Sequence, residues 1–89
     1  MQYVYILHSL KDMGLYIGYT TDLRKRYQLH QDGKVLSTKH RLPVKLIYYE
    51  SYLNRIDAKK REIFLKSGSG HRFIKKQLSN YLRNNPLAR

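Results

Sequence analysis

The sequence predicts an α+β domain, with a three-stranded antiparallel sheet flanked by helices in the order β-β-α-β-α-α. Two strand-like runs lie close together in residues 2–19, a third occupies residues 44–50, and helix-forming segments follow the second and third runs. The chain has 89 residues, which suits one small core. We therefore expect a single domain over residues 1–83 and a flexible C-terminal tail over residues 84–89.

The first two runs predict an antiparallel hairpin. Residues 2–8 are rich in β-branched and aromatic side chains, and their alternation would separate Tyr3, Tyr5 and Leu7 from Val4 and Ile6. Residues 9–14 supply turn-forming side chains, and residues 15–19 alternate again. Gly18 lies inside this second strand and has no side chain to pack, so it indicates a place where another backbone or a ligand comes close.

A helix is expected at residues 21–31, with Thr20 or Thr21 as its N-cap. Leu23 and Tyr27 are four residues apart and would pack on the sheet. Arg26 and His30 have the same spacing and would share an adjacent edge of the helix.

The second half of the chain continues with a basic loop and the third strand. The loop covers residues 34–43, the strand residues 44–50, and a helix is expected at 55–66 with Asn54 or Asp57 as its cap. Residues 67–70, Ser-Gly-Ser-Gly, would end that helix, and residues 73–82 predict a last helix.

Charge is the strongest signal in the composition. The chain has 18 Lys and Arg against 6 Asp and Glu, a formal net charge of +12. Such a field attracts polyanions, of which nucleic acid is the commonest for a protein of this size. A basic surface without a specific ligand and a ribosome-associated or RNA-binding role are the alternatives on charge alone. Membrane binding is not expected, since no helix segregates an apolar face strongly enough.

Other classes are excluded by what the sequence lacks. There is no cysteine, so disulfides, thiolate metal sites and a cysteine nucleophile are absent. No stretch approaches the roughly 18 apolar residues of a membrane span. The N-terminal residues do not have the pattern of a signal peptide, and a cytoplasmic location is the expectation.

Four side chains with useful chemistry would converge in this fold. Tyr5 and Tyr16 lie on adjacent strands, and the helix that follows carries Arg26 back across the sheet. Glu62 lies between Ala58 and Leu65 on its helix, and a carboxylate in apolar surroundings needs a cation, either an arginine or a metal. Each residue alone has an ordinary explanation. The tyrosines are good strand formers, Arg26 and His30 suit a helix surface, and Glu62 has helical spacing to Lys59 and Lys66.

Their joint order resembles the GIY-YIG nuclease family over about residues 2–80. The first motif stands here as Tyr3-Val4-Tyr5 and the second as Tyr16-Ile17-Gly18. The segment YIGYTTDLRKRYQLH at residues 16–30 is similar to the family's strand, capped helix, arginine and histidine, and Ala58 and Glu62 match its Ala-x-x-x-Glu pattern. Tyr3 departs from the motif, which has glycine there. The chain looks most like the small stand-alone bacterial members, which are related to the N-terminal nuclease domain of UvrC.

The resemblance implies the GIY-YIG fold and a metal-dependent endonuclease that hydrolyses DNA phosphodiester bonds, with structure selectivity and a role in DNA repair or recombination as further expectations. Glu62 would bind Mg²⁺ or Mn²⁺, weakly without substrate, and Arg26 would bind the phosphate. Tyr5 and Tyr16 would be the active-site phenols, His30 would assist, and Gly18 would leave room for backbone or substrate.

These roles are chemically reasonable. Forming a phenolate at pH 7 from an ordinary tyrosine costs about 4 kcal/mol, and a nearby Arg26 or metal would reduce that cost. Mg²⁺ keeps several waters and accepts phosphate oxygens, so a single carboxylate is a usable ligand set.

The partner expected from charge and resemblance together is DNA, with RNA as an alternative, and no membrane or small-molecule cofactor. A non-catalytic nucleic-acid-binding module that keeps the same fold is the rival interpretation. The basic residues expected to hold the nucleic-acid backbone lie in the middle loop and in the C-terminal third of the chain: Lys34, Lys39, Arg41, Lys59, Arg61, Lys66, Arg72, Lys75 and Lys76.

Overall fold

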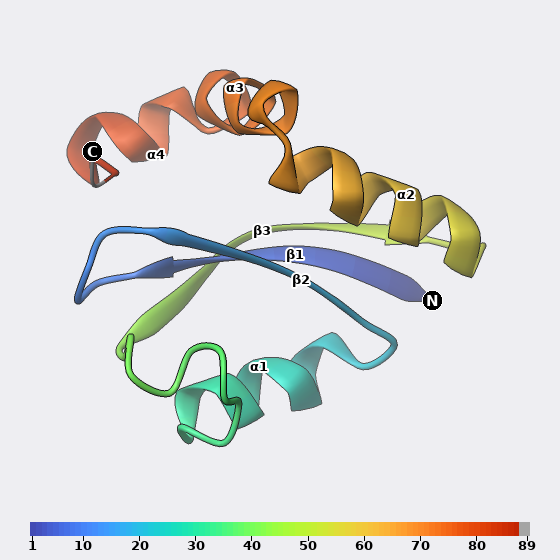
Figure 1. The fold of residues 1–89 in the computed structure, drawn as a ribbon, viewed down its shortest axis with the longest axis horizontal. Coiled ribbons are helices and arrows are strands. Elements are labelled where there is room, and N and C mark those ends of the chain that lie inside the picture. Colours follow the sequence, from blue (N-terminus) through green and yellow to red (C-terminus); the bar gives the residue numbers. More distant parts are fainter. Residues whose placement is uncertain (88–89) are drawn as a thin grey trace.

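The computed structural model describes residues 1–87 and has one sheet with helices on both faces (Figure 1). Its elements, in chain order, are β1 (Gln2–Ser9), β2 (Leu15–Thr20), α1 (Leu23–Gln31), β3 (Val44–Tyr52), α2 (Arg55–Lys66), α3 (Gly68–Gln77) and α4 (Ser79–Asn84).

The sheet has the strand order β2-β1-β3, and both pairs of strands are antiparallel. Figure 1 shows α1 on one face of the sheet and α2, α3 and α4 on the other. The predicted fold class is therefore confirmed. The register places Tyr5 of β1 opposite Gly18 of β2 and opposite Tyr49 of β3.

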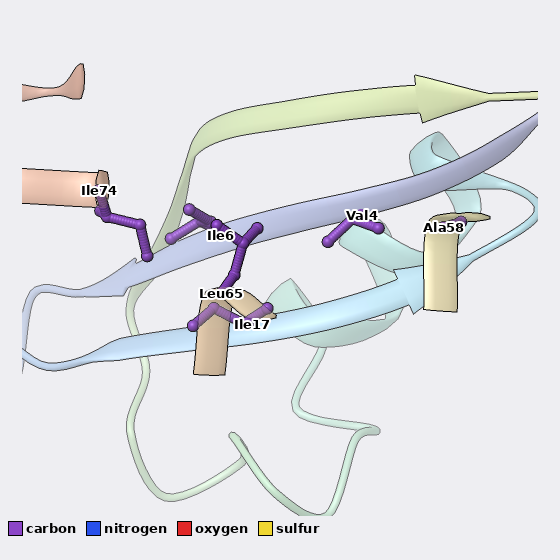
Figure 2. Packing of buried hydrophobic residues seen from close by; sticks show 6 residues of the cluster. All are labelled: Val4, Ile6, Ile17, Ala58, Leu65 and Ile74. Atoms are coloured by element: carbon purple, nitrogen blue, oxygen red, sulfur yellow. The ribbon is translucent and has the colours of Figure 1, made fainter. Parts of the chain in front are cut away.

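Each face of the sheet has its own apolar cluster, because successive side chains of a strand point to opposite faces. The cluster under α2 and α3 contains the six buried residues drawn in Figure 2: Val4, Ile6, Ile17, Ala58, Leu65 and Ile74. The cluster on the α1 face is built around Tyr5, Leu7 and Val44, with Leu23 and Tyr27 of α1 packed against it. The alternation and the two packing residues of α1 are as the sequence predicted.

The start of α1 differs slightly from the prediction. Asp22, not Thr20 or Thr21, is the N-cap, and its side chain accepts a hydrogen bond from the backbone N–H of Lys25. Asn54, one of the two candidate caps for α2, accepts from the N–H groups of Ile56 and Asp57. The boundaries of α2 agree with the prediction.

The segment after α2 was predicted wrongly. Only Ser67 lies between α2 and α3, and Gly68 already belongs to α3, so residues 67–70 are not a four-residue break. Ser67 caps α3 by accepting from the N–H of Gly70. The expected helix 73–82 is divided into α3 and α4 at Leu78. Glycine-rich segments suggest breaks, but here the small residues let α3 begin directly against α2.

The C-terminal helix is anchored by a buried histidine that the sequence analysis assigned no role. His8 of β1 is fully buried, and its Nδ1 lies 2.8 Å from the hydroxyl of Tyr81 in α4. The side chain of Asn85 donates to the carbonyl of Tyr81. Regular structure thus continues to Asn84, within the segment expected as a tail, and residues 88–89 of that segment lie outside the described residues.

No helix within residues 1–87 has the length and apolar content that a membrane crossing needs.

The junction between α2 and α3 gives a stability prediction. A Cβ at position 70 would overlap the carbonyl of Phe64 and the backbone of Leu65, whereas at position 68 its nearest neighbour is the flexible side chain of Arg72 at 3.8 Å. We expect Gly70→Ala to lower the free energy of unfolding by about 3 kcal/mol or more, because the helices must separate. Gly68→Ala should change it by less than about 1 kcal/mol. Urea unfolding followed by circular dichroism measures both, and equal stability of the two variants would contradict this account.

Candidate active site

The candidate site is built on the buried ring of Tyr5. Tyr5 is 1% exposed, and its ring covers Gly18 on the neighbouring strand so closely that a Cβ there would overlap the ring and its hydroxyl. The sequence predicted that a backbone or a ligand approaches Gly18. The group that approaches is instead an aromatic side chain from the adjacent strand.

Tyr5 is linked to α1 through His30. The Tyr5 hydroxyl lies 2.8 Å from Nε2 of His30, and Nδ1 of His30 lies 2.7 Å from the hydroxyl of Thr38. All three side chains are buried. Burial, followed by the charge of Arg26, lowers the pKa of His30 to about 4. The ring is therefore neutral at pH 7, so one nitrogen donates and the other accepts.

Thr38 was missed from the sequence. It lies in the loop that was described only as basic, and it is fully buried there. A lone threonine in a loop has no distinguishing pattern, and its role depends on the path by which the loop returns under α1.

Tyr16 and Arg26 complete the cluster. The ring of Tyr16 lies 6.3 Å from that of Tyr5 and 5.2 Å from that of His30, measured between centroids. Hydrogen bonding to Tyr5 raises the pKa of Arg26 further, against the opposing effect of burial. Among residues 1–87, no acceptor faces the buried Nε of Arg26. The structure thus brings together four of the five predicted catalytic residues.

The two phenols differ in their surroundings. Burial raises the pKa of Tyr5 to about 12, although the hydrogen bond with Arg26 acts in the opposite direction. Arg26 thus favours the phenolate, as expected from the sequence, but burial outweighs it, and ionising Tyr5 at pH 7 would cost about 7 kcal/mol. Tyr16 is only partly buried. Tyr16 is therefore the phenol that a bound molecule can reach.

Glu62, the fifth predicted catalytic residue, does not belong to this cluster, because its helix lies on the other face of the sheet (Figure 1). It belongs to α2, is 8% exposed, and accepts from Lys59 at 2.9 Å and from Lys66 at 3.2 Å. Burial raises its pKa, but the hydrogen bonds from the two lysines outweigh that effect and lower it. The expectation that phenols, guanidinium and carboxylate meet on one sheet surface is wrong, because α1 and α2 cover opposite faces (Figure 1).

Glu62 nevertheless lies on the side of α2 that is turned toward β2. Arg61 points the other way and pairs with Glu50 of β3, while Lys59, the partner of Glu62, lies 4.7 Å from the ring centre of Tyr19 in β2. β2 is an edge strand and also carries Tyr16. The carboxylate and the phenols thus lie on opposite faces of the sheet, and β2 is the strand they have in common.

The described residues do not form a ready metal cage. Within residues 1–87, no three His, Cys, Asp or Glu side chains cluster in a way that would hold an ion. Glu62 is the carboxylate predicted from the sequence to bind a metal, and both of its oxygens accept hydrogen bonds from lysines. A divalent ion fits only if water and substrate oxygens supply most of its ligands, as Mg²⁺ allows.

Four of the nine predicted nucleic-acid-binding residues form ion pairs within the protein. Arg41 pairs with Asp12 at 2.8 Å and joins the hairpin turn to the basic loop. Arg61 donates two hydrogen bonds to Glu50, which also accepts from Tyr48 and Tyr52. Lys59 and Lys66 pair with Glu62 but are 42% and 55% exposed. The other five predicted residues are all exposed: Lys34, Lys39, Arg72, Lys75 and Lys76.

Comparison with known proteins identifies the family. The sequence profile of the GIY-YIG catalytic domain matches residues 1–77, which include every residue of the candidate site. The chain belongs to the GIY-YIG nuclease family. No solved structure matches the chain.

Several relatives in this family are small bacterial proteins. A UPF0213 protein of Clostridium perfringens is 45% identical over 67 residues, covering 74% of this chain and 71% of that protein. One from Streptococcus pneumoniae is 45% identical over 65 residues, covering 72% of this chain and 65% of that protein. A UPF0213 protein of Pediococcus acidilactici is 40% identical over 86 residues, covering 93% and 82%. The resemblance seen in the sequence motifs is confirmed.

The buried histidine gives a pH prediction. Because the pKa of His30 is about 4 in the folded protein and 6.5 in the unfolded chain, the unfolded state binds a proton first as the pH falls. This contribution to stability is complete above about pH 6.5 and is lost progressively down to about pH 4. We expect the free energy of unfolding to fall by about 2 kcal/mol between pH 7.5 and pH 5 through His30 alone.

Comparison of His30→Gln with His71→Gln isolates this effect. His71→Gln, at an exposed position, is the control for replacing a histidine, and only His30→Gln should flatten the pH dependence. Urea unfolding at both pH values provides the measurement. Parallel stability profiles for the parent and His30→Gln would show that His30 is not held neutral.

Proposed function

We propose that this protein is a divalent-metal-dependent endonuclease that hydrolyses DNA phosphodiester bonds at the outer edge of β2. The observation that carries the proposal is the cluster of Tyr5, Tyr16, Arg26 and His30, joined by hydrogen bonds and ring contacts in a chain of the GIY-YIG family. The net charge of +12 supports a polyanionic substrate.

Arg26 would bind the phosphate and stabilise the charge that develops on it. Its guanidinium already lies beside two phenols, and its Nε has no acceptor within the described part of the chain. A planar guanidinium bonds two phosphate oxygens at once, which a lysine ammonium does not do in the same geometry.

Tyr16 would contact the reacting groups, and Tyr5 would hold the site in place. Only Tyr16 is accessible, while Tyr5 is fully enclosed by Gly18, His30 and the sheet. We infer that Tyr16 orients the attacking water. The buried series Tyr5, His30 and Thr38 then fixes α1, and with it Arg26, at a constant distance from Tyr16.

Glu62 is the residue that would hold the metal. A bound Mg²⁺ or Mn²⁺ would polarise a phosphoryl oxygen and lower the pKa of a bound water. For Glu62 to serve, at least one lysine must release its carboxylate, and the anionic phosphates of a substrate offer the lysines an alternative partner. The lysines and Glu62 would then lie along one side of the phosphodiester, and Arg26 along the other.

A second candidate is a binding module without catalysis. It is favoured by one observation, that both oxygens of Glu62 are already occupied by lysines. In that case the carboxylate only orders two cations that hold a nucleic-acid backbone.

Cleavage assays distinguish the two candidates. End-labelled flap, junction, nicked, single-stranded and duplex DNA, with an RNA of the same sequence, would be incubated with Mg²⁺, with Mn²⁺ and with chelator. We expect cut products only with metal, and the preferred shape would define any selectivity and any role in repair. Salt-sensitive binding without products on every substrate would support the binding module instead.

Glu62→Gln tests the carboxylate directly. We expect cleavage to fall at least about 100-fold while DNA affinity in chelator stays within about threefold, because the fold keeps a hydrogen-bonding side chain of equal size. Asp57→Asn is the matched control, since Asp57 is an exposed carboxylate on the same helix, and it should cleave like the parent. If Glu62→Gln retains parental cleavage, this residue does not bind the metal.

Arg26→Lys tests the guanidinium. The charge is kept but the planar fork is lost, so we expect cleavage to fall by about 100-fold, or roughly 3 kcal/mol of transition-state stabilisation. Arg83→Lys, at an exposed position of α4, is the control and should have no effect. Single-turnover rates at saturating protein separate the chemical step from binding, and a loss confined to affinity would argue against a role in catalysis.

A further inference from the structure

A pocket separate from the cluster around Tyr5 lies on the α1 face, on the β3 side. It has a volume of about 450 Å³, within the range typical of small-ligand sites. Its walls come from β1, β3 and the start of α1, and none of the five predicted catalytic residues lines it. The lining residues are Tyr3, Thr21, Asp22, Leu23, Arg24, Tyr27, Leu46 and Tyr49.

Two tyrosine rings form one side of this pocket. Tyr3 and Tyr49 meet edge to face, with centroids 6.1 Å apart and planes inclined by 64°. Tyr49 is 54% exposed, although it is a large aromatic residue in the middle of a strand. Tyr3 is the residue that departs from the glycine of the family motif. An exposed ring that lies beside a pocket can stack against a flat aromatic ligand.

The floor and rim of the pocket suit a nucleotide. Leu23, Tyr27 and Leu46 supply apolar surface, and Arg24 supplies an exposed guanidinium at the rim. Asp22 adds an acceptor on the same rim, near the N-terminus of α1. An apolar floor with aromatic walls, one donor and one acceptor matches a base with polar edges better than it matches a lipid or an aliphatic chain.

The position of the pocket relates it to the candidate active site. Tyr5 lies between the two, since its strand partners are Gly18 on one side and Tyr49 on the other. Neighbouring strands are about 5 Å apart, so the pocket begins roughly one strand beyond the buried ring of Tyr5. A polynucleotide held at Arg26 therefore has its next nucleotides within reach of Tyr49.

We propose that this pocket binds an unpaired base of the nucleic-acid strand that the active site acts on, by stacking it on Tyr49 and Tyr3. The inference rests on the proposed function, and it makes single-stranded or distorted DNA the preferred substrate class. Base-paired DNA keeps its bases inside the duplex and cannot fill the pocket. A second copy of this chain is a poor occupant, because two surfaces on molecules of charge +12 repel each other.

Binding measurements in chelator, where no cleavage occurs, test the proposal. Fluorescence anisotropy with labelled oligo(dT) and with a blunt duplex of equal charge would be compared for the parent, Tyr49→Ala and Tyr49→Phe. We expect Tyr49→Ala to weaken single-strand binding about tenfold and duplex binding by less than about twofold, while Tyr49→Phe keeps both within about twofold. Equal losses on the two DNAs, or no loss on either, would overturn the inference.

Two controls make the result specific. Ile63→Ala removes an exposed apolar side chain, 70% exposed, from α2 on the opposite face, and it should change neither affinity. Titration with a free nucleoside monophosphate should show much weaker binding than oligo(dT), and equal affinity would assign the pocket to a free nucleotide and overturn the inference. If the parent binds no DNA at all, the proposed function fails. If the parent binds and cuts DNA while Tyr49→Ala behaves identically, only the pocket assignment fails.

Discussion

The contact between the ring of Tyr5 and the bare backbone of Gly18 determines how the rest of the site is arranged. Because Gly18 has no side chain, the hydroxyl end of the ring can lie against β2, and the hydroxyl lies 2.8 Å from Nε2 of His30 on α1. That bond joins the sheet to the helix that carries Arg26. A larger residue at position 18 would displace the ring, and the displacement would be transmitted through His30 to the guanidinium.

The two faces of the sheet differ in the kinds of side chain that they bury. The face under α2 and α3 is an apolar core that stabilises the fold (Figure 2), whereas the α1 face combines apolar packing with hydrogen-bonded phenols, an imidazole and a guanidinium. Buried polar groups raise stability only when their partners are present. Tyr5 and Thr38 each form a hydrogen bond with one nitrogen of the His30 ring, so neither ring nitrogen is buried without a partner.

The sequence predicts the features that depend on local periodicity and on motifs. Strand alternation separated Tyr5 and Leu7 from Val4 and Ile6 correctly. Helical spacing correctly predicted that Leu23 and Tyr27 of α1 pack on the sheet. It did not reveal Thr38, whose role depends on a loop path, or the bond from His8 to Tyr81, which joins residues 73 positions apart. It also placed Glu62 with the phenols, because spacing along a helix does not determine which face of a sheet that helix covers.

The charge of Glu62 is compensated by lysines of its own helix. A buried carboxylate that keeps its charge needs compensation, and Lys59 and Lys66 provide it from within the same helix. These residues therefore have no electrostatic need for a divalent ion while the protein is alone. Under the proposed function, a phosphate backbone at β2 would offer the same lysines a competing anionic partner, and the carboxylate would become available. Under the proposed function, metal affinity would then depend on the substrate, since Glu62 becomes a strong ligand only when the lysines have somewhere else to bind.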